Sequence, residues 1–357
     1  MREPNWAILL ALALALVVCC GCAGARRQEA HGGPFWGFAL HGHPVTERQL
    51  AGVENSTGVR PRIVVFYLQW PRPGGEGHFP VESLRAIWRA GALPVLTWEP
   101  ASFENGNLSA VPHGLILDGT YDEYITRFAR QAKKWERPFV IRFAHEMNTK
   151  KYHWGTSEKD FGPESTAIYQ KIFRHVVDIF RKEGALNALW AFCPNAESVP
   201  APAYEPGSAL HPAWNRAENY YPGDGYVEIL GMDGYNWGFT RKKKRDGWES
   251  RWKSFREIFG PLYEDLKRLS PEKPVVVFET ASVAEGGDKP AWIREAVSAA
   301  REWGISGIAW FEAVAEEDWR LESGMAGQYR ELIEGRRDAR EWARRILHQK
   351  LKRLRAP

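Results

Sequence analysis

The chain has 357 residues, of which 44% are hydrophobic and 26% are charged, and its formal net charge at pH 7 is +4. This length and apolar content suit a single α/β barrel of roughly 250 residues with its loops, and they exclude a largely disordered chain. Residues 336–357 hold nine Lys and Arg against Asp338 and Glu341, a contribution of +7, which leaves −3 for the rest of the chain. Because the main body is not basic, nucleic acid is not expected as a partner.

The N-terminus predicts an export signal. An apolar run over residues 6–18 is too short to span a bilayer comfortably, but it suits the core of a signal peptide. Residues 19–22 read Cys-Cys-Gly-Cys and resemble the processing site of bacterial lipoproteins, while cleavage after residues 23–25 is the alternative. We therefore expect residues 1–22 to be a signal peptide. The mature protein is then extracellular, at the cell surface or periplasmic, with a lipid anchor through Cys22.

Short β-branched and aromatic runs alternate with helical patterns along the rest of the chain. The runs are almost continuously apolar, which is typical of parallel strands buried on both faces. Pro290 and Gly304 mark the start and end of the last helical pattern, whereas Gly260-Pro261 is expected to break or kink the pattern before it. The predicted strands are 35–41, 62–70, 93–98, 139–145, 188–192, 227–233, 275–279 and 307–311, and the predicted helices are 81–89, 121–135, 164–182, 251–269 and 289–303.

Eight such units predict an α/β fold, a (β/α)8 TIM barrel that forms a single catalytic domain over residues 30–335. The rival is a doubly wound open sheet, which is disfavoured because no glycine-rich phosphate fingerprint follows the first strand. Residues 195–225 form a long loop candidate, rich in Pro and aromatic residues, after the fifth strand. Structureless loops of that length are uncommon unless they are functional.

The C-terminal residues 336–357 predict a basic helix. Leu347, Leu351 and Leu354 recur at helical spacing among the basic residues. We expect this apolar stripe to pack on the barrel, and the alternative is a helix that lies on an anionic membrane surface.

Polar and aromatic residues follow the predicted strands, at the end of the barrel where active sites of this fold lie. Two of them, Glu146 and Glu279, are carboxylates on the fourth and seventh strands, which lie across the barrel from each other. Cleavage of a glycosidic bond needs such a pair, one as acid and one as nucleophile or base, and a separation of roughly 5–5.5 Å gives retention. The polar and aromatic residues at these strand ends are His41, Gln69, Trp70, Trp98, Glu99, His145, Glu146, Asn195, Asp233, Tyr235, Glu279 and Trp310.

Several segments at these strand ends together resemble glycoside hydrolase family 26. The most specific is Arg-Phe-Ala-His-Glu-Met-Asn over residues 142–148, followed by Trp154. The resemblance extends from about Phe35 to about Tyr329. Its other segments are Tyr-Tyr-Pro-Gly-Asp at 220–224, Gly-Met-Asp-Gly-Tyr-Asn-Trp at 231–237, Val-Phe-Glu-Thr at 277–280 and Ala-Trp-Phe at 309–311.

The resemblance implies a retaining endo-β-glycanase, most often a β-mannanase acting on β-1,4-linked mannan, and less often a mixed-linkage β-glucanase or a xylanase. It implies that Glu146 is the acid/base and that Glu279 is the nucleophile, which forms a glycosyl-enzyme. The remaining roles concern substrate binding: His145 holds the sugar near the cleavage point, Tyr235 bonds to the nucleophile, Asp233 lies in the adjoining subsite, and Trp98, Trp154 and Trp310 contact the sugar.

The chain departs from the family pattern at two places. Trp98-Glu99-Pro100 stands where many mannanases have Trp-His-Pro, and residues 149–151 read Thr-Lys-Lys where Gly followed by an aromatic residue is common. Both changes fall in substrate subsites, so hydrolysis is expected and the sugar stays open. A mixed-linkage β-1,3-1,4-glucan or a self-produced surface polysaccharide is the alternative substrate, and a non-catalytic carbohydrate-binding protein is the alternative class.

No cofactor is expected, because two carboxyl groups meet both catalytic roles. No metal site is expected either, since His41 and His43 lack a third ligand. Arg142 lies on the same strand as Glu146, so a structural ion pair between them is an alternative to a catalytic carboxylate. The expected partner is a polysaccharide bound by a monomer.

Overall fold

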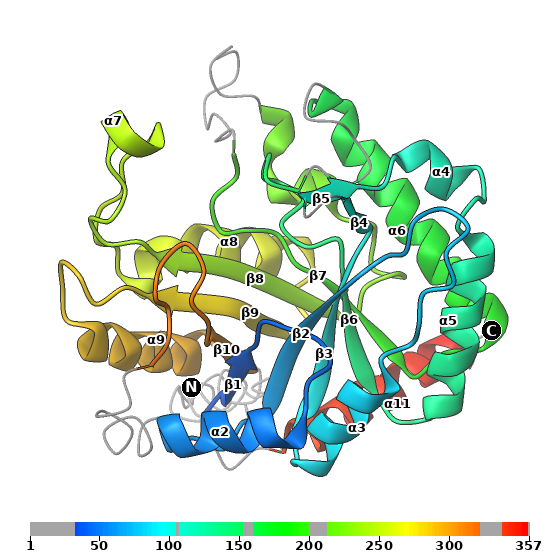
Figure 1. Cartoon of the computed structure of the whole chain (residues 1–357), viewed down its shortest axis with the longest axis horizontal. Helices are drawn as coiled ribbons and strands as arrows, with labels where there is room; N and C mark the ends of the chain where they lie inside the picture. The colour runs from blue at the N-terminus through cyan, green and yellow to red at the C-terminus, as the bar shows by residue number, and fades with distance from the viewer. Residues whose placement is uncertain are drawn as a thin grey trace, which may run out of the picture. The chain divides into compact units, whose positions relative to one another are not determined.

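The computed structural model describes residues 33–104, 107–152, 154, 160–199, 213–321 and 338–355. Eight parallel strands close into a barrel in the order β1-β10-β9-β8-β7-β6-β3-β2, with helices around it (Figure 1). All eight predicted strands are confirmed, and the fold is the expected (β/α)8 barrel. The strands are β1 (Phe35–Ala39), β2 (Ile63–Gln69), β3 (Leu93–Glu99), β6 (Phe139–Phe143), β7 (Ala188–Phe192), β8 (Ile229–Asn236), β9 (Val275–Ser282) and β10 (Gly307–Phe311).

The predicted helices are also present, with bounds that differ by a few residues at most. One long helix was not predicted, although Thr46 caps its start through a hydrogen bond from Gln49 N and Gly58 ends it with a left-handed backbone. The helices around the barrel are α2 (Glu47–Thr57), α3 (Val81–Arg89), α5 (Asp122–Trp135), α6 (Glu164–Glu183), α8 (Phe255–Leu269), α9 (Lys289–Trp303) and α11 (Ala339–Arg355). Shorter elements in the connections are the hairpin β4 (Ala101–Glu104) and β5 (Asn107–Ala110), the helices α4 (His113–Leu117) and α7 (Lys243–Asp246), and the 3-10 turns Ala213–Asn215 and Ala217–Tyr220.

The expected break at Gly260-Pro261 does not occur, because α8 continues through Pro261. Pro261 cannot donate to the carbonyl one turn earlier, and this costs stability. A capping box between Ser254 and Glu257 stabilises the start of the helix, and its buried face stabilises the rest. Burial of that face outweighs one missing hydrogen bond. The buried residues are Phe255, Ile258, Phe259, Leu262 and Leu266.

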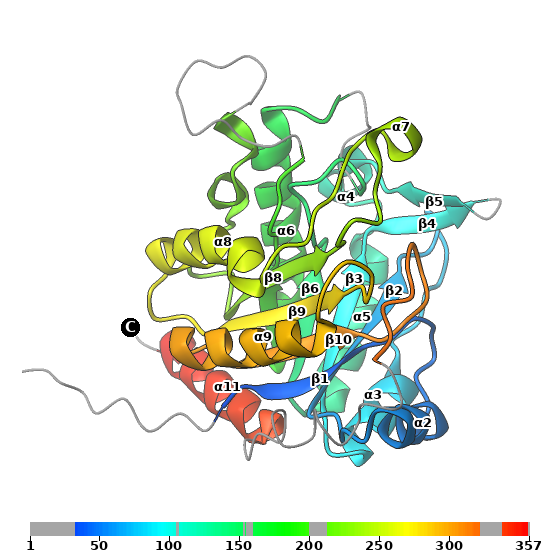
Figure 2. The same cartoon turned by 90° about the vertical axis from the view of Figure 1, so that its left-hand side faces the viewer.

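Helix α11 packs across the end of the barrel where the strands begin. Lys350 Nζ donates to the carbonyl of Ala188, the first residue of β7, at 2.6 Å. Figures 1 and 2 show α11 at the opposite end of the barrel from α7. The packed helix is as expected, and Leu347 lies against the core, but Leu354 is 46% exposed, so the predicted stripe packs only in part. The buried residues are Ala339, Trp342, Ala343, Ile346 and Lys350.

The residues from Gly33 onward form one compact unit. The predicted signal peptide, Cys22 and residues 200–212 of the long loop lie outside the described residues. In the part of the chain that the structure describes, no helix combines the length and apolar character needed to cross a membrane.

Truncation of the buried stripe of α11 tests how this helix packs. The ring of Trp342 lies edge-on to Phe35, with centroids 5.0 Å apart. We expect Trp342→Ala to lower the free energy of unfolding by about 3–5 kcal/mol because it leaves a cavity. Leu354→Ala is the control and should change it by less than about 0.5 kcal/mol. Urea unfolding curves measure both, and equal effects would contradict the observed packing.

Candidate active site

A buried arginine organises the C-terminal end of the barrel. Arg142 on β6 is fully buried and hydrogen-bonds to two carboxylates, Asp233 on β8 and Glu279 on β9. Its guanidinium also donates to Thr97 Oγ1 at 2.9 and 2.7 Å. A register shift between Met232 and Asp233 places Asp233 opposite Glu279 in the β8–β9 pair. Three strands thus bring one guanidinium group and two carboxyl groups together.

Glu279 is held in its ionised form by several donors. Tyr67 OH donates to Oε1 at 2.7 Å, and Tyr235 OH donates to Oε2 at 2.6 Å. Burial opposes ionisation, but Arg142 and the donors around the carboxylate together lower the pKa of Glu279 to about 2. The hydrogen bond expected from Tyr235 is therefore present, and Tyr67 adds a second one.

Glu146 has the opposite protonation state. It lies just beyond β6, and Asn195 Nδ2 donates to its Oε1 at 2.8 Å. Burial is the larger cause and the negative charge of Glu279 the second, and together they raise the pKa of Glu146 to about 7. Below about pH 7, Glu146 is therefore a carboxylic acid while Glu279 is a carboxylate.

The loop that carries Glu146 is strained and tightly fastened. Ala144 and Glu146 adopt positive φ values of 47° and 51°, which are unfavourable for residues with a Cβ. Glu146 N donates to Cys193 O at 2.8 Å. Asn148 exchanges side-chain and backbone hydrogen bonds with Asn195, at 2.9 Å each. These bonds to the segment after β7 hold the acid in one place.

His145 lies beneath an aromatic stack. Tyr152 and Trp154 stack in parallel with centroids 4.9 Å apart, and Tyr152 lies 4.7 Å from the His145 ring. Within the described residues, neither ring nitrogen of His145 has a hydrogen-bond partner. Burial and then the charge of Arg142 lower the pKa of His145 well below its usual value, so the imidazole is neutral. A neutral imidazole offers one donor and one acceptor, but His145 has no exposed surface and Tyr152 lies against it, so sugar contact there stays a prediction.

Glu99 provides a third carboxyl group in the site. Gln69 Nε2 donates to its Oε2 at 2.5 Å, and its Oε1 lies 4.0 Å from Nδ1 of His145. Burial raises the pKa of Glu99 to about 7. Lys151 pairs with Glu316 at 3.2 Å, so the altered segment after Asn148 contacts the loop after β10.

Two of the tryptophans predicted to contact sugar are core residues instead. Trp98 stacks on Phe128 of α5 at 4.3 Å and is fully buried. Trp310 is fully buried against Trp292 of α9, and its Nε1 donates to Trp319 O at 2.8 Å. Both point outward to the helices, because side chains alternate along a strand. The next residues along the two strands, Glu99 and Phe311, face the site.

Two further predictions need correction. Asp233 has no exposed surface and pairs with Arg142, so it supports Glu279 rather than touching a sugar. Trp154 is buried, and Tyr152 covers one face of its indole, so it is not the open wall that was expected. The alternative ion pair between Arg142 and Glu146 is also wrong, because Arg142 pairs across the barrel with Glu279 and Asp233.

A metal ion does not fit this donor set. His145, Asp233 and Glu279 offer ligand atoms within 4.8 Å of one another. The guanidinium of Arg142 already lies against both carboxylates and would repel a second cation.

Sequence reasoning missed Tyr67 and the role of Arg142. Tyr67 is two residues before Gln69 on the same strand, and the period of two places both on the barrel's inner side. Arg142 precedes the His-Glu pair in an apolar strand, where a charge needs buried partners. Neither signal identifies the residues that Tyr67 and Arg142 contact.

The fold and this site together define the class of protein. The protein is a (β/α)8 barrel with a pair of carboxyl groups of the kind that glycosidases use. Residues 116–249, which include Glu146 and Tyr235, match the model for glycosyl hydrolase family 26. The chain belongs to this family.

Curated relatives agree with this assignment, and a solved structure shares the fold. The chain is 34% identical to Endoglucanase H of Acetivibrio thermocellus over 270 residues, 74% of this chain and 26% of that protein. It is 27% identical to a mannan endo-1,4-beta-mannosidase of Bacillus subtilis over 173 residues, 43% of each chain. The chain thus spans about a quarter of the first relative and under half of the second. A GH26 beta-mannanase from Bacteroides ovatus has the same fold, with a TM-score of 0.57, 18% identity and 85% and 89% coverage.

Removal of the buried guanidinium tests its structural role. We expect Arg142→Met to lower the free energy of unfolding by about 3–5 kcal/mol at pH 7, because two buried carboxylates lose their cation. The pKa of Glu279 is depressed in the folded state, so its pairing stabilises above about pH 4.3 and is lost as pH falls toward 2. The difference in free energy of unfolding between wild type and Arg142→Met should therefore shrink as the pH falls.

Denaturant unfolding at pH 7 and pH 3 measures this change. Arg127→Met, which removes an exposed ion pair with Glu123, is the control and should cost at most about 1 kcal/mol. A deficit for Arg142→Met that does not depend on pH would contradict the pairing.

Proposed function

We propose that this protein is a retaining endo-β-glycanase in which Glu146 is the acid/base and Glu279 is the nucleophile. The observation that carries the proposal is the contrast between two neighbouring buried carboxyl groups, one with a pKa near 7 and one with a pKa near 2. Glycoside hydrolysis with retention needs one protonated and one ionised carboxyl group at the same time.

In the first step, Glu146 gives its proton to the glycosidic oxygen. Glu279 attacks the anomeric carbon from the other side of the ring, so the bond to the leaving sugar breaks as a glycosyl ester forms. Arg142, Tyr67 and Tyr235 keep Glu279 ionised and correctly oriented before the attack.

In the second step, Glu146 must accept a proton instead of donating one. Ester formation removes the negative charge of Glu279, which is one cause of the raised pKa of Glu146. Glu146 is then a carboxylate that takes a proton from water, and this water attacks the anomeric carbon and releases Glu279. The coupling between the two groups thus supports both halves of the reaction.

For the substrate we propose a β-1,4-linked glucan, pure or mixed-linkage, with β-mannan as the second candidate. The relative named as an endoglucanase matches more of the chain, at higher identity, than those named as mannosidases. Glu99 supports the same preference, since its carboxyl group lies 4.0 Å from His145 at the position where many mannanases that the chain resembles have a histidine. Mannan is supported by the mannosidase relatives.

We also propose export with a lipid anchor at Cys22. Its support is the apolar run over residues 6–18 and the cysteine-containing segment that follows.

The test of the function is release of reducing sugar from a panel of polymers. The panel contains mixed-linkage β-glucan, galactomannan, glucomannan and xylan. We expect wild type to act most strongly on β-glucan and Glu279→Ala to be inactive on every polymer. The control is Glu285→Ala, an exposed carboxylate in the loop after the same strand, which should retain full activity. Activity in Glu279→Ala would overturn the assignment, and preference for galactomannan would replace only the substrate.

The pH profile tests the roles of the two carboxyl groups. The reaction needs Glu146 protonated, so kcat/KM should fall as pH rises through about 7. It needs Glu279 ionised, so activity should also fall as pH drops toward about 2. Glu146→Gln should lower kcat about 10²–10⁴-fold and remove the alkaline limb. If that limb persists in Glu146→Gln, another group is the acid.

A further inference from the structure

The end of the barrel opposite the active site presents a basic surface. Helix α11 covers this end and buries Trp342, Ile346 and Lys350. Its other side faces solvent and carries Arg344 and, in its last turn, Lys352, Arg353 and Arg355. The sequence concentrates the positive charge of the chain in this segment, and the fold spreads it over one end of the molecule.

Arginines from different elements converge here on two tryptophans. The guanidinium carbons of Arg137, Arg340 and Arg344 each lie 5.5 Å from the centre of the Trp88 ring. Arg137 also lies 5.2 Å from Trp135. Stacking on indole fixes the orientation of guanidinium groups and leaves their N–H edges free for an anion.

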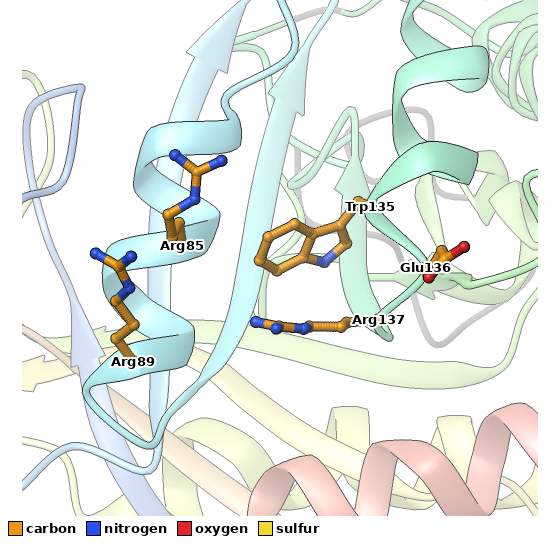
Figure 3. Close-up of a pocket in the computed structure, with 5 residues that line it drawn as sticks. All are labelled: Arg85, Arg89, Trp135, Glu136 and Arg137. Atoms are coloured by element: carbon orange, nitrogen blue, oxygen red, sulfur yellow. The ribbon is translucent and has the colours of Figure 1, made fainter.

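A pocket of about 360 Å³ opens beside these rings, between the ends of α3 and α5. Figure 3 shows Trp135 and Arg137 reaching toward α3, which carries Arg85 and Arg89. Glu136 completes the lining. Three guanidinium groups thus line a space large enough for a phosphate group with its substituents.

Acidic residues balance only part of this charge. Arg89 pairs with Glu47 at 3.3 Å, and Arg340 pairs with Asp338 at 3.2 Å. Like charges without partners repel one another, and a bound anion would relieve that repulsion. Within the described ranges, no acidic partner contacts Arg85, Arg137, Arg344, Lys352, Arg353 or Arg355.

We propose that this basic end is a docking surface for a bilayer that contains anionic phospholipid, and that the pocket accepts a lipid phosphate. The unpaired cations extend from the pocket along α11, which fits an extended anionic plane better than one small ion. Guanidinium groups bind phosphate oxygens in a bidentate manner. Docking by this end leaves the opposite, catalytic end open to solvent.

The course of the chain supports a membrane as the partner. Strand β1 begins at this same end, where Phe35 contacts Trp342 of α11. The link to residues 1–32 is therefore made beside the basic surface. A lipid anchor upstream of Gly33, as proposed above, would attach to the barrel at this end.

The test is partition of the full chain onto vesicles of phosphatidylcholine with and without phosphatidylglycerol. The apolar segment 6–18 carries no charge and is present in every variant, so it contributes equally to both vesicles. We expect the anionic lipid to increase partition at low salt and the increase to vanish at high salt. Each basic residue near such a surface contributes about fivefold, so loss of three should lower the increase roughly 100-fold.

Two triple variants probe the surface. One changes Arg85, Arg137 and Arg344 to Gln. The other changes Lys352, Arg353 and Arg355 to Gln, which lie in the exposed last turn of α11 and leave the core intact. The matched control changes Lys242, Lys243 and Lys244 to Gln, an equal loss of charge in exposed residues at the catalytic end.

Loss of the phosphatidylglycerol-dependent increase in both basic-end variants, with the control unchanged, supports docking. An equal loss in the control, or no increase for wild type, overturns it. Binding to a soluble anionic polysaccharide without any increase on the vesicles also overturns it. The readout does not depend on hydrolysis, so it stands apart from the proposed function.

Discussion

The site depends on one buried cation. Arg142 has no contact with solvent, so its charge is tolerated only because Asp233, Glu279 and Thr97 surround it. The same contacts keep Glu279 ionised in a place where burial alone would protonate it. The negative charge that results then raises the pKa of Glu146. One guanidinium therefore keeps Glu279 ionised, and the resulting charge adds to the effect of burial on the pKa of Glu146.

The residues that make these contacts come from strands all around the barrel. Arg142, Asp233 and Glu279 come from β6, β8 and β9, and Tyr67 comes from β2. None of these contacts is local in sequence, so the site exists only when the barrel closes. The strained backbone at Glu146 is maintained in the same way, by hydrogen bonds from the segment after β7.

The two ends of the barrel carry their charges in different ways. The C-terminal end holds buried, mutually balanced charges, which suit chemistry at a defined position. The end covered by α11 holds exposed and unbalanced charges, which suit attraction to an extended surface. Helix α11 has two roles at this end, because its buried face closes the barrel core and its exposed face carries the positive charge.

The sequence by itself determined the eight strands, most of the long helices and the catalytic candidates. Eight apolar runs, their spacing, and two carboxylates at the ends of the fourth and seventh were sufficient for the barrel and for the pair Glu146 and Glu279. It did not determine which side of a strand faces the site, because strands buried on both faces show no alternation of polarity. Only the tertiary structure turned Trp98 and Trp310 toward the helices and Glu99 and Phe311 toward the site. It alone also decided that Arg142 pairs across the barrel, since partners separated by 91 and 137 residues leave no local signal.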